Sequence, residues 1–325
     1  MTASYDTAVR NMLLYGELMR VLRILRAAGV PAIVLKGAAL ADTIYPSIAS
    51  RPMNDIDLLI RPAHRDRARA ALEAAGFPFL PEPRQRFSPF DTEFTGEMKF
   101  RRGERHSVDL HWELTPLEWL RRLAALDDEA LWQEARPFEI GGVQAYQLSA
   151  RDTLLHLCLH LSVHGYRHEN GFQDIQRLLE HEQPFLWERF VARARQFRLT
   201  AICYFVLDAL ASMPDVPIPA GVLAALRPPR WQRWLVPAIA DARRGLAGQL
   251  VYNVSRDRLL HLALADRPAD VPRLMVWLFF PGPRWLAERY RLPGRLRPYL
   301  ACLWHPGVVL AQGAAAVWAL AAARR

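Results

Sequence analysis

Asn54–Ile60 reads NDIDLLI, and its apolar end predicts a short buried strand. Side chains alternate across a strand, so Asp55 and Asp57 point to one side and Ile56 and Leu58 to the other. Two ionised carboxylates held this close repel each other and are costly to bury unpaired. A divalent cation is the usual solution, since Mg²⁺ binds one or two carboxylates together with phosphate oxygens. The stretch therefore indicates a metal site, or else two acids that bond to solvent or arginine at a strand end.

Two flanking segments favour the metal site. Upstream, Pro31–Leu35 is a strand candidate that runs into Lys36–Leu40, which is typical of a helix start. The glycine at position 37 lets backbone N–H groups approach a phosphate, and the helix N-terminus favours the anion. Downstream, Ser107–Trp112 predicts a third strand, on which Asp109 faces away from its apolar neighbours. A third carboxylate is then expected to join the first two.

The order of these motifs resembles the polymerase-β-like nucleotidyltransferase superfamily. A bacterial family of uncharacterised nucleotidyltransferases is more narrowly similar, at Leu35–Gly37, Arg51, Asp55–Asp57 and Val108–Trp112. The resemblance covers most of residues 15–300. It departs from the wider superfamily after Gly37, where Ala38 stands in place of a serine or glycine. The alanine removes a hydroxyl that would contact phosphate, and Lys36 is expected to compensate.

The resemblance implies metal-dependent transfer of a nucleoside monophosphate from an NTP to an acceptor hydroxyl or similar group. It implies Asp55, Asp57 and Asp109 as catalytic ligands of Mg²⁺ or Mn²⁺, and Lys36, Gly37 and Arg51 as triphosphate-binding residues. For Arg51 the alternative is a loop arginine in water. The acceptor stays open between tRNA, protein, peptide and small molecule. The alternatives in function are a non-catalytic nucleotide- or RNA-binding accessory protein on the same fold, and a toxin-like transferase that modifies tRNA.

The composition is that of a globular protein with an anionic partner. The chain has 325 residues, of which 51% are apolar, and a formal net charge of +9. This charge favours nucleotide, nucleic acid or acidic lipid, although it also reflects a preference for arginine, because only Lys36 and Lys99 are lysines. Three widely spaced cysteines and the absence of a signal-peptide pattern at Met1–Arg10 favour a cytoplasmic protein. A location peripheral to the inner membrane is the alternative.

The predicted fold class is α+β, with a domain boundary near residue 148. Residues 1–148 are expected to form the polymerase-β-like catalytic domain, a mixed sheet with helices that starts with an N-terminal helix. Within it, Glu93–Arg101 and Arg105–Leu114 predict a hairpin, and residues 135–146 predict two short strands. Residues 149–325 show long amphipathic helices and are expected to form a mainly helical acceptor domain.

Several polar side chains are candidates for lining the catalytic cleft. His156, His160 and His164 follow at i, i+4 and i+8 and so lie on one stripe of a helix. Three nitrogens along a straight helix rarely reach one Zn²⁺ ion, so a stripe facing the cleft is the preferred interpretation. Asp174 on the next helix would orient one of these histidines. His111 shares the facing of the predicted strand aspartate and is either a cleft residue or a structural histidine.

The last third of the chain combines arginine with aromatic residues. Residues 227–298 contain 14 arginines and 5 acids, interleaved with tryptophan and tyrosine. This composition suits a surface that binds nucleic acid, an interfacial membrane helix, or a helical bundle in an arginine-rich protein. Val308–Ala323 is apolar but shorter than about 20 residues, so no transmembrane span is expected.

Overall fold

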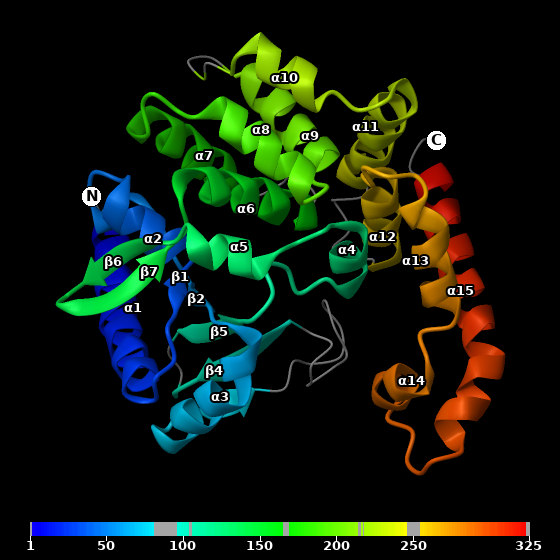
Figure 1. Ribbon diagram of the computed structural model, residues 1–325, viewed down its shortest axis with the longest axis horizontal. Coiled ribbons are helices and arrows are strands. Elements are labelled where there is room, and N and C mark those ends of the chain that lie inside the picture. The colour runs from blue at the N-terminus through cyan, green and yellow to red at the C-terminus, as the bar shows by residue number, and fades with distance from the viewer. Residues whose placement is uncertain are drawn as a thin grey trace.

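The computed structural model describes residues 2–80, 96–103, 106–164, 169–213, 216, 218–245 and 254–322. Within these residues one mixed sheet has the strand order β3-β4-β5-β2-β1-β7-β6 (Figure 1). The strands are β1 (Ile33–Val34), β2 (Asp55–Leu59), β3 (Phe79–Leu80), β4 (Glu97–Arg101), β5 (Ser107–His111), β6 (Arg136–Ile140) and β7 (Val143–Gln147). The α+β class and the mixed sheet predicted from the sequence are confirmed.

Helices surround the sheet and make up the second half of the chain. The helices are α1 (Thr2–Ala27), α2 (Lys36–Thr43), α3 (Arg65–Ala74), α4 (Glu118–Leu123), α5 (Asp128–Gln133), α6 (Ala150–Val163), α7 (Glu169–His181), α8 (Trp187–Gln196), α9 (Thr200–Ala211), α10 (Ala220–Leu226), α11 (Arg230–Gly245), α12 (Val254–Ala263), α13 (Asp270–Phe279), α14 (Pro283–Tyr290) and α15 (Arg297–Ala322), with short 3-10 turns η1 (Ile48–Ser50) and η2 (Pro62–His64). Figure 1 shows α6 to α10 stacked above the sheet and α15 along the far edge.

The centre of the sheet mixes parallel and antiparallel pairs. β2 lies antiparallel to β1 and parallel to β5, and β4 and β5 form the predicted antiparallel hairpin. β6 and β7 form a second hairpin, closed by Gly141 and Gly142 with φ of 52° and 75°. Two consecutive residues with positive φ are the geometry of a tight hairpin turn, which glycine adopts without a steric penalty.

The two faces of the sheet pack against different partners. Ile56 and Leu58 of β2 belong to a hydrophobic cluster that includes the buried stripe of α1. Leu59 belongs instead to a larger cluster with residues of α6 to α9, which also takes in Ile33 and Leu35. Because side chains alternate along a strand, the aspartates of β2 share the facing of Leu59 and lie on the side toward α6. The larger cluster joins residues on both sides of position 148.

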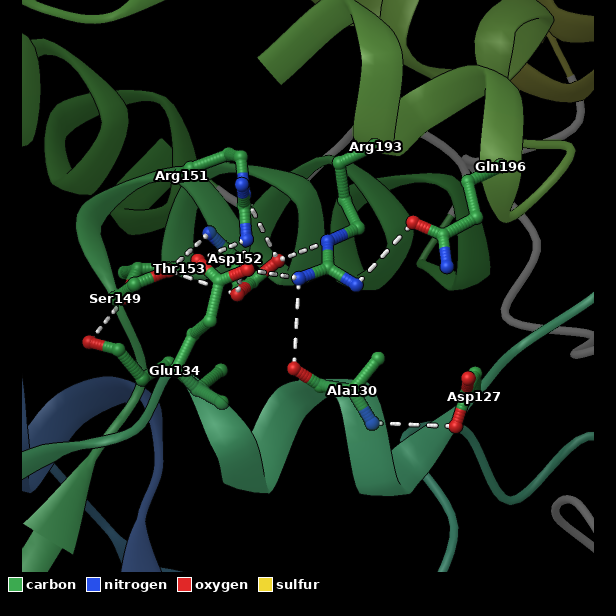
Figure 2. Close-up of polar contacts among 10 residues, drawn as sticks. Asp127, Ala130, Glu134, Ser149, Arg151, Asp152, Thr153, Arg193 and Gln196 are labelled. Carbon is green, nitrogen blue, oxygen red and sulfur yellow. Dashed lines mark hydrogen bonds and ion pairs between the residues drawn. The ribbon is translucent and has the colours of Figure 1, made fainter. Parts of the chain in front are cut away.

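A buried ion network joins the helical half to the segment that precedes it. Asp152 in the first turn of α6 is fully buried and lies 3.1 Å from the Arg193 guanidinium of α8. Its other oxygen accepts a hydrogen bond of 2.7 Å from Ser149. Figure 2 shows Arg193 reaching between α6 and α5, where it also pairs with Glu134 at 3.0 Å. The Asp152 and Arg193 charges are removed from water, so each depends on being paired, whereas Glu134 lies at the surface.

The C-terminal helix is longer than the sequence expectation assumed. That expectation considered Val308–Ala323 only, whereas α15 begins at Arg297. Among the described residues, the helical segment Arg297–Trp318 is long enough and apolar enough to cross a membrane, judged by length and composition alone. Only a small part of this segment is buried in the protein.

Candidate active site

The carboxylates predicted to share one site come from two neighbouring parallel strands. Asp57 of β2 is the direct partner of Asp109 on β5, and Asp55 lies two residues away on the same face. Lys99 on β4 is in turn the partner of Asp109 across the antiparallel pair. The strand register therefore places these four side chains on the face of the sheet that is turned toward α6.

Asp57 is the most strongly held of the three carboxylates. One of its oxygens accepts a hydrogen bond of 2.8 Å from the Lys36 ammonium and lies 3.0 Å from Nε2 of His111. Burial alone would raise the pKa of Asp57, but these two cationic neighbours outweigh it and hold that pKa well below its ordinary value. Asp57 therefore stays ionised and anchors both partners.

His111 bridges two acids. Its Nε2 contacts Asp57, and its Nδ1 lies 3.1 Å from a carboxylate oxygen of Glu97 on β4. Burial lowers the pKa of His111, but the hydrogen bond to Asp57 and the charge of Glu97 raise it above its ordinary value. His111 thus lies in the candidate site, as one of the two interpretations from the sequence predicted. The sequence motifs did not point to Glu97. A signal for Glu97 was present in the alternation of side chains along the strand. Glu97 and Lys99 are two residues apart and therefore both face the carboxylates.

Asp109 and Asp55 carry negative charge that is only partly compensated. Lys99 lies 3.1 Å from one oxygen of Asp109, while the other is buried and has no hydrogen-bond partner among the described residues. Burial raises the pKa of Asp109 to about 6. The charge of Asp57, followed by burial, raises the pKa of the exposed Asp55 to about 6 as well. Both shifts reflect the repulsion between carboxylates predicted from the sequence.

Side chains of the protein relieve part of this repulsion. In the part of the chain that the structure describes, no group of three or more His, Cys, Asp or Glu side chains is arranged to hold a metal ion. Lys36, Lys99 and His111 contact the aspartates instead. The residues nevertheless fit a divalent cation, because the bare Asp109 oxygen and the two raised carboxyl pKa values mark negative charge that a cation would neutralise.

Lys36 owes its position to an unusual backbone conformation at the start of α2. Its φ is 46°, in the left-handed region that a residue with a β-carbon rarely adopts. Such strain is typical of functional sites, where the surrounding contacts hold it in place. Here the contact is the ion pair with Asp57, which outweighs burial and raises the pKa of Lys36. The chain therefore keeps a buried cation beside the first amides of α2.

Arg51 is held in place by the helical half of the protein. Its guanidinium donates two hydrogen bonds, of 2.8 and 2.7 Å, to the carboxylate of Asp174 on α7. The Tyr45 hydroxyl donates a third, of 2.7 Å. The structure thus places Asp174 against Arg51 and Tyr45, and its proposed role in orienting a histidine stays a prediction. Sequence reasoning missed Tyr45, which carries no motif of its own.

Gly37 lies directly against Arg51. A β-carbon at position 37 would lie 2.4 Å from Nη1 of Arg51 and 3.2 Å from the Met53 side chain. Such an approach is closer than van der Waals contact allows. Glycine is therefore needed here for space, and the fixed guanidinium beside the start of α2 depends on it.

Replacing Gly37 by Ala is expected to lower the free energy of unfolding by about 1–3 kcal/mol, since Arg51 cannot move without breaking its bonds to Asp174. Chemical denaturation measures this. The matched control is Gly16→Ala in α1, where nothing lies within 4 Å of the added carbon and alanine should stabilise the helix by about 0.5–1 kcal/mol. Equal gains in both variants would contradict the close packing at Gly37.

The histidine stripe of α6 lies over the same face of the sheet. His156 is buried, and neither of its ring nitrogens has a hydrogen-bond partner among the described residues. Burial and then the charge of Lys36 lower the pKa of His156 to about 3, and the same two causes lower that of His160. His164 follows at a ring distance of 4.4 Å from His160. His156 and His160 therefore present neutral imidazoles near Lys36.

A cavity of about 290 Å³ opens beside Lys36, between α2, α6 and α7. Thr153, His156 and Gln147 contribute polar groups to its lining, and Leu40 and Leu157 contribute apolar ones. The cavity joins the ion-paired lysine to the uncharged histidine. It provides room for a polar molecule next to Lys36, which is ion-paired with Asp57.

Comparisons with known proteins find similar solved structures and one matching protein family. No curated protein matches the chain. Among solved structures, the lincomycin-bound lincosamide antibiotic adenylyltransferase LnuA has 17% identity, 51% coverage of this chain, 97% of its own and a TM-score of 0.36. The antibiotic-resistance factor ANT(2'')-Ia has 13% identity, coverages of 62% and 93%, and a TM-score of 0.36. An antigenic nucleotidyltransferase-like protein from Paracoccidioides brasiliensis has 16% identity, coverages of 65% and 92%, and a TM-score of 0.38.

A family model gives the decisive match. Residues 1–213 match the family described as uncharacterised nucleotidyltransferase. The matched segment contains the three aspartates, Lys36, Arg51 and the histidine helix α6. It covers well over half of the chain, and the family predicted from the sequence motifs is confirmed. The chain therefore belongs to this family of nucleotidyltransferases.

Proposed function

We propose that the protein transfers a nucleoside monophosphate from an NTP to an acceptor hydroxyl, with the help of a divalent cation. The observation that carries the proposal is the parallel register that sets Asp57 opposite Asp109, with Asp55 on the same face. Lys36, Lys99 and His111 compensate this cluster only in part, and the raised pKa values of Asp55 and Asp109 mark negative charge that costs stability unless a metal cation joins the carboxylates. A fold that only binds a partner has no use for that cost.

Asp55, Asp57 and Asp109 would hold the cation, which is Mg²⁺ or Mn²⁺ in this proposal. When bound, the cation supplies positive charge and Lewis acidity to the phosphate oxygens. The Asp109 oxygen without a hydrogen-bond partner and the carboxyl pKa values raised to about 6 support this assignment. Lys36 bonds to Asp57 and lies among the same carboxylates.

The triphosphate would lie at the start of α2. The amide of Gly37 and the neighbouring helix N-terminus favour an anion there, and the Lys36 ammonium adds a full positive charge. Arg51 lies against Gly37 and would also bind the triphosphate. Its bonds to Asp174 hold the guanidinium in a fixed position. A guanidinium already held in place loses little freedom when phosphate binds.

The acceptor would enter from the cavity beside Lys36. Asp109, the carboxylate whose second oxygen has no hydrogen-bond partner among the described residues, would take the proton of the attacking hydroxyl. Neutral His156 and Thr153 in the cavity lining would donate or accept hydrogen bonds to the other polar groups of the acceptor. This chemistry suits a polar, hydroxyl-bearing acceptor.

The test combines binding and transfer. Thermal melting of the parent with Mg²⁺ and NTP, compared with EDTA, should show a gain of about 2.7 kcal/mol at a hundredfold excess of NTP over Kd. NTPs labelled at the α-phosphate, incubated with fractionated cell extract, should pass label to one fraction of tRNA, protein or small molecules. Asp109→Asn should lose both the gain and the transfer.

Asp42→Asn is the matched control, since Asp42 is an exposed aspartate on α2 outside the three-carboxylate cluster. It should keep the stabilisation and the transfer of the parent. Stabilisation of the parent by NTP without any labelled product would favour the non-catalytic accessory protein. An Asp109→Asn protein that transfers label at the parental rate would contradict the proposed site.

A further inference from the structure

The C-terminal helix α15 exposes large apolar side chains and buries small or polar ones, the reverse of a helix in a water-soluble domain. Its large apolar side chains point outward, and Leu303 is 81% and Trp318 74% exposed. The face turned toward the rest of the protein holds small or polar residues instead, with Ala301, His305 and Ala316 buried. A helix in a water-soluble domain normally buries its large apolar side chains and exposes its polar ones.

The exposed residues form one continuous stripe. Leu300, Leu303, Leu310 and Val317 follow at spacings of three, seven and seven, which places them on one face of the helix, and Leu296 lies just ahead of it. All five are exposed. Figure 1 shows α15 along the outer edge of the molecule, with α12 and α13 on its inner side. A contiguous apolar patch of this kind marks an interaction surface.

Three exposed arginines lie at the N-terminal end of this stripe. Arg291, Arg295 and Arg297 are all exposed where the chain enters α15. Residues 298–323 contain no Asp, Glu, Lys or Arg, so the helix offers no acid with which these arginines could pair. A partner that covers the stripe must therefore combine an apolar interior with negative charge at its surface.

We propose that α15 binds an anionic phospholipid bilayer, lying in the plane of the interface with its leucine stripe at the acyl boundary. Arg291, Arg295 and Arg297 would contact lipid phosphates. A second copy of the chain fits less well, because it brings the same arginines and, in either orientation, no acid on α15 to pair with them. Nucleic acid would satisfy the arginines but has no apolar interior for Leu303 and Leu310.

The packing of α15 favours an in-plane helix over a spanning one. His305 is hydrogen-bonded to Tyr290 of α14 at 2.7 Å and to the Leu278 carbonyl of α13 at 3.0 Å. If α15 crossed the bilayer in this packing, α14 would enter the hydrocarbon with Arg284 and Glu288. Charges at that depth are costly, whereas at the interface they face the headgroups. The proposal does not depend on the proposed transfer reaction.

The experiment is co-sedimentation of the full-length protein with vesicles of phosphatidylcholine alone and of phosphatidylcholine with phosphatidylglycerol. The parent should sediment with the anionic vesicles, bind the neutral ones at least about tenfold more weakly, and lose affinity as salt is added. Leu303→Glu combined with Leu310→Glu should reduce binding to anionic vesicles by at least about tenfold, because two exposed leucines no longer enter the acyl region.

The matched control is Leu186→Glu, which makes the same change at a leucine that is 57% exposed ahead of α8. It should bind like the parent, and circular dichroism should find every variant folded, since each changed side chain is on the surface. Equal binding by the double variant and the control would overturn the proposal. So would a parent that ignores vesicles and instead forms a dimer that the double variant abolishes. A protein that resists extraction from vesicles by alkaline carbonate would overturn the in-plane arrangement.

Discussion

Asp57→Asn is expected to lower the free energy of unfolding by about 3–5 kcal/mol in metal-free buffer. The substitution keeps the shape of the side chain but removes the charge that pairs with Lys36 at 2.8 Å and contacts His111 at 3.0 Å. The side chains of Lys36 and His111 are both largely buried. Without the Asp57 charge, each would keep its cationic group in the interior but lose the main counter-charge. Chemical denaturation in EDTA measures the loss.

Asp109→Asn is the informative comparison, because the same substitution one strand away should act in the opposite direction. Burial raises the pKa of Asp109 to about 6, whereas an unfolded aspartate titrates near 3.9. Ionised Asp109 therefore costs stability, by about 1–3 kcal/mol, and the cost appears as pH rises from about 4 to about 6. At about pH 8 the Asn variant should be as stable as the parent or more so, and near pH 4 the difference should vanish.

The pKa of Asp57 is held below its ordinary value, so its contribution is present above about pH 4 and is lost as pH falls below that range. Opposite pH dependences of the two variants would thus separate the two roles. Equal losses of stability in both variants would contradict them. Asp57 differs from the other two carboxylates because Lys36 and His111 both contact it.

Asp152→Asn is expected to cost about 3–5 kcal/mol as well, although Asp152 belongs to a different network. It is fully buried, lies 3.1 Å from Arg193, and accepts a hydrogen bond from Ser149 (Figure 2). Removing its charge leaves the buried Arg193 guanidinium with a smaller set of partners. Transfer activity, adjusted for the folded fraction, should stay at the parental level, which separates this variant from those of the candidate active site.

A double-mutant cycle tests the coupling. Arg193→Met alone should cost about as much as Asp152→Asn, and the double variant should lose less than the sum, since each single change leaves a buried charge without its main partner. Glu129→Gln is the control, because Glu129 pairs with Arg61 at 3.0 Å on the surface and such pairs contribute about 0–1 kcal/mol. Additive losses in the cycle would show that Asp152 and Arg193 act independently.

The sequence alone determined the features that depend on local order along the chain. Alternation along NDIDLLI put Asp55 and Asp57 on one face, and the same rule put Lys99 on the facing of Glu97 and His111 on that of Asp109. Motif order predicted the family and the mixed sheet, since strand, glycine, helix and acidic strand follow one another within a short stretch of chain. These signals are local because backbone geometry fixes which side chains share a face.

Only the tertiary structure decided which of these side chains meet. The parallel register of β2 and β5 aligns Asp57 with Asp109, and the pairing of β4 with β5 brings in Glu97, which no motif marks. The bond between Arg51 and Asp174 joins residues more than a hundred positions apart in the chain.

The tertiary structure also decided which face of α15 is exposed. This helix is apolar along most of its length. Composition cannot say which face of such a helix is covered, and the packing of α12 to α14 left Leu303 and Leu310 exposed. Long-range pairing and the choice of buried face depend on the sum of many weak contacts across the fold. A single stretch of sequence contains only one of the two partners in each such contact, so it cannot show by itself which contacts form.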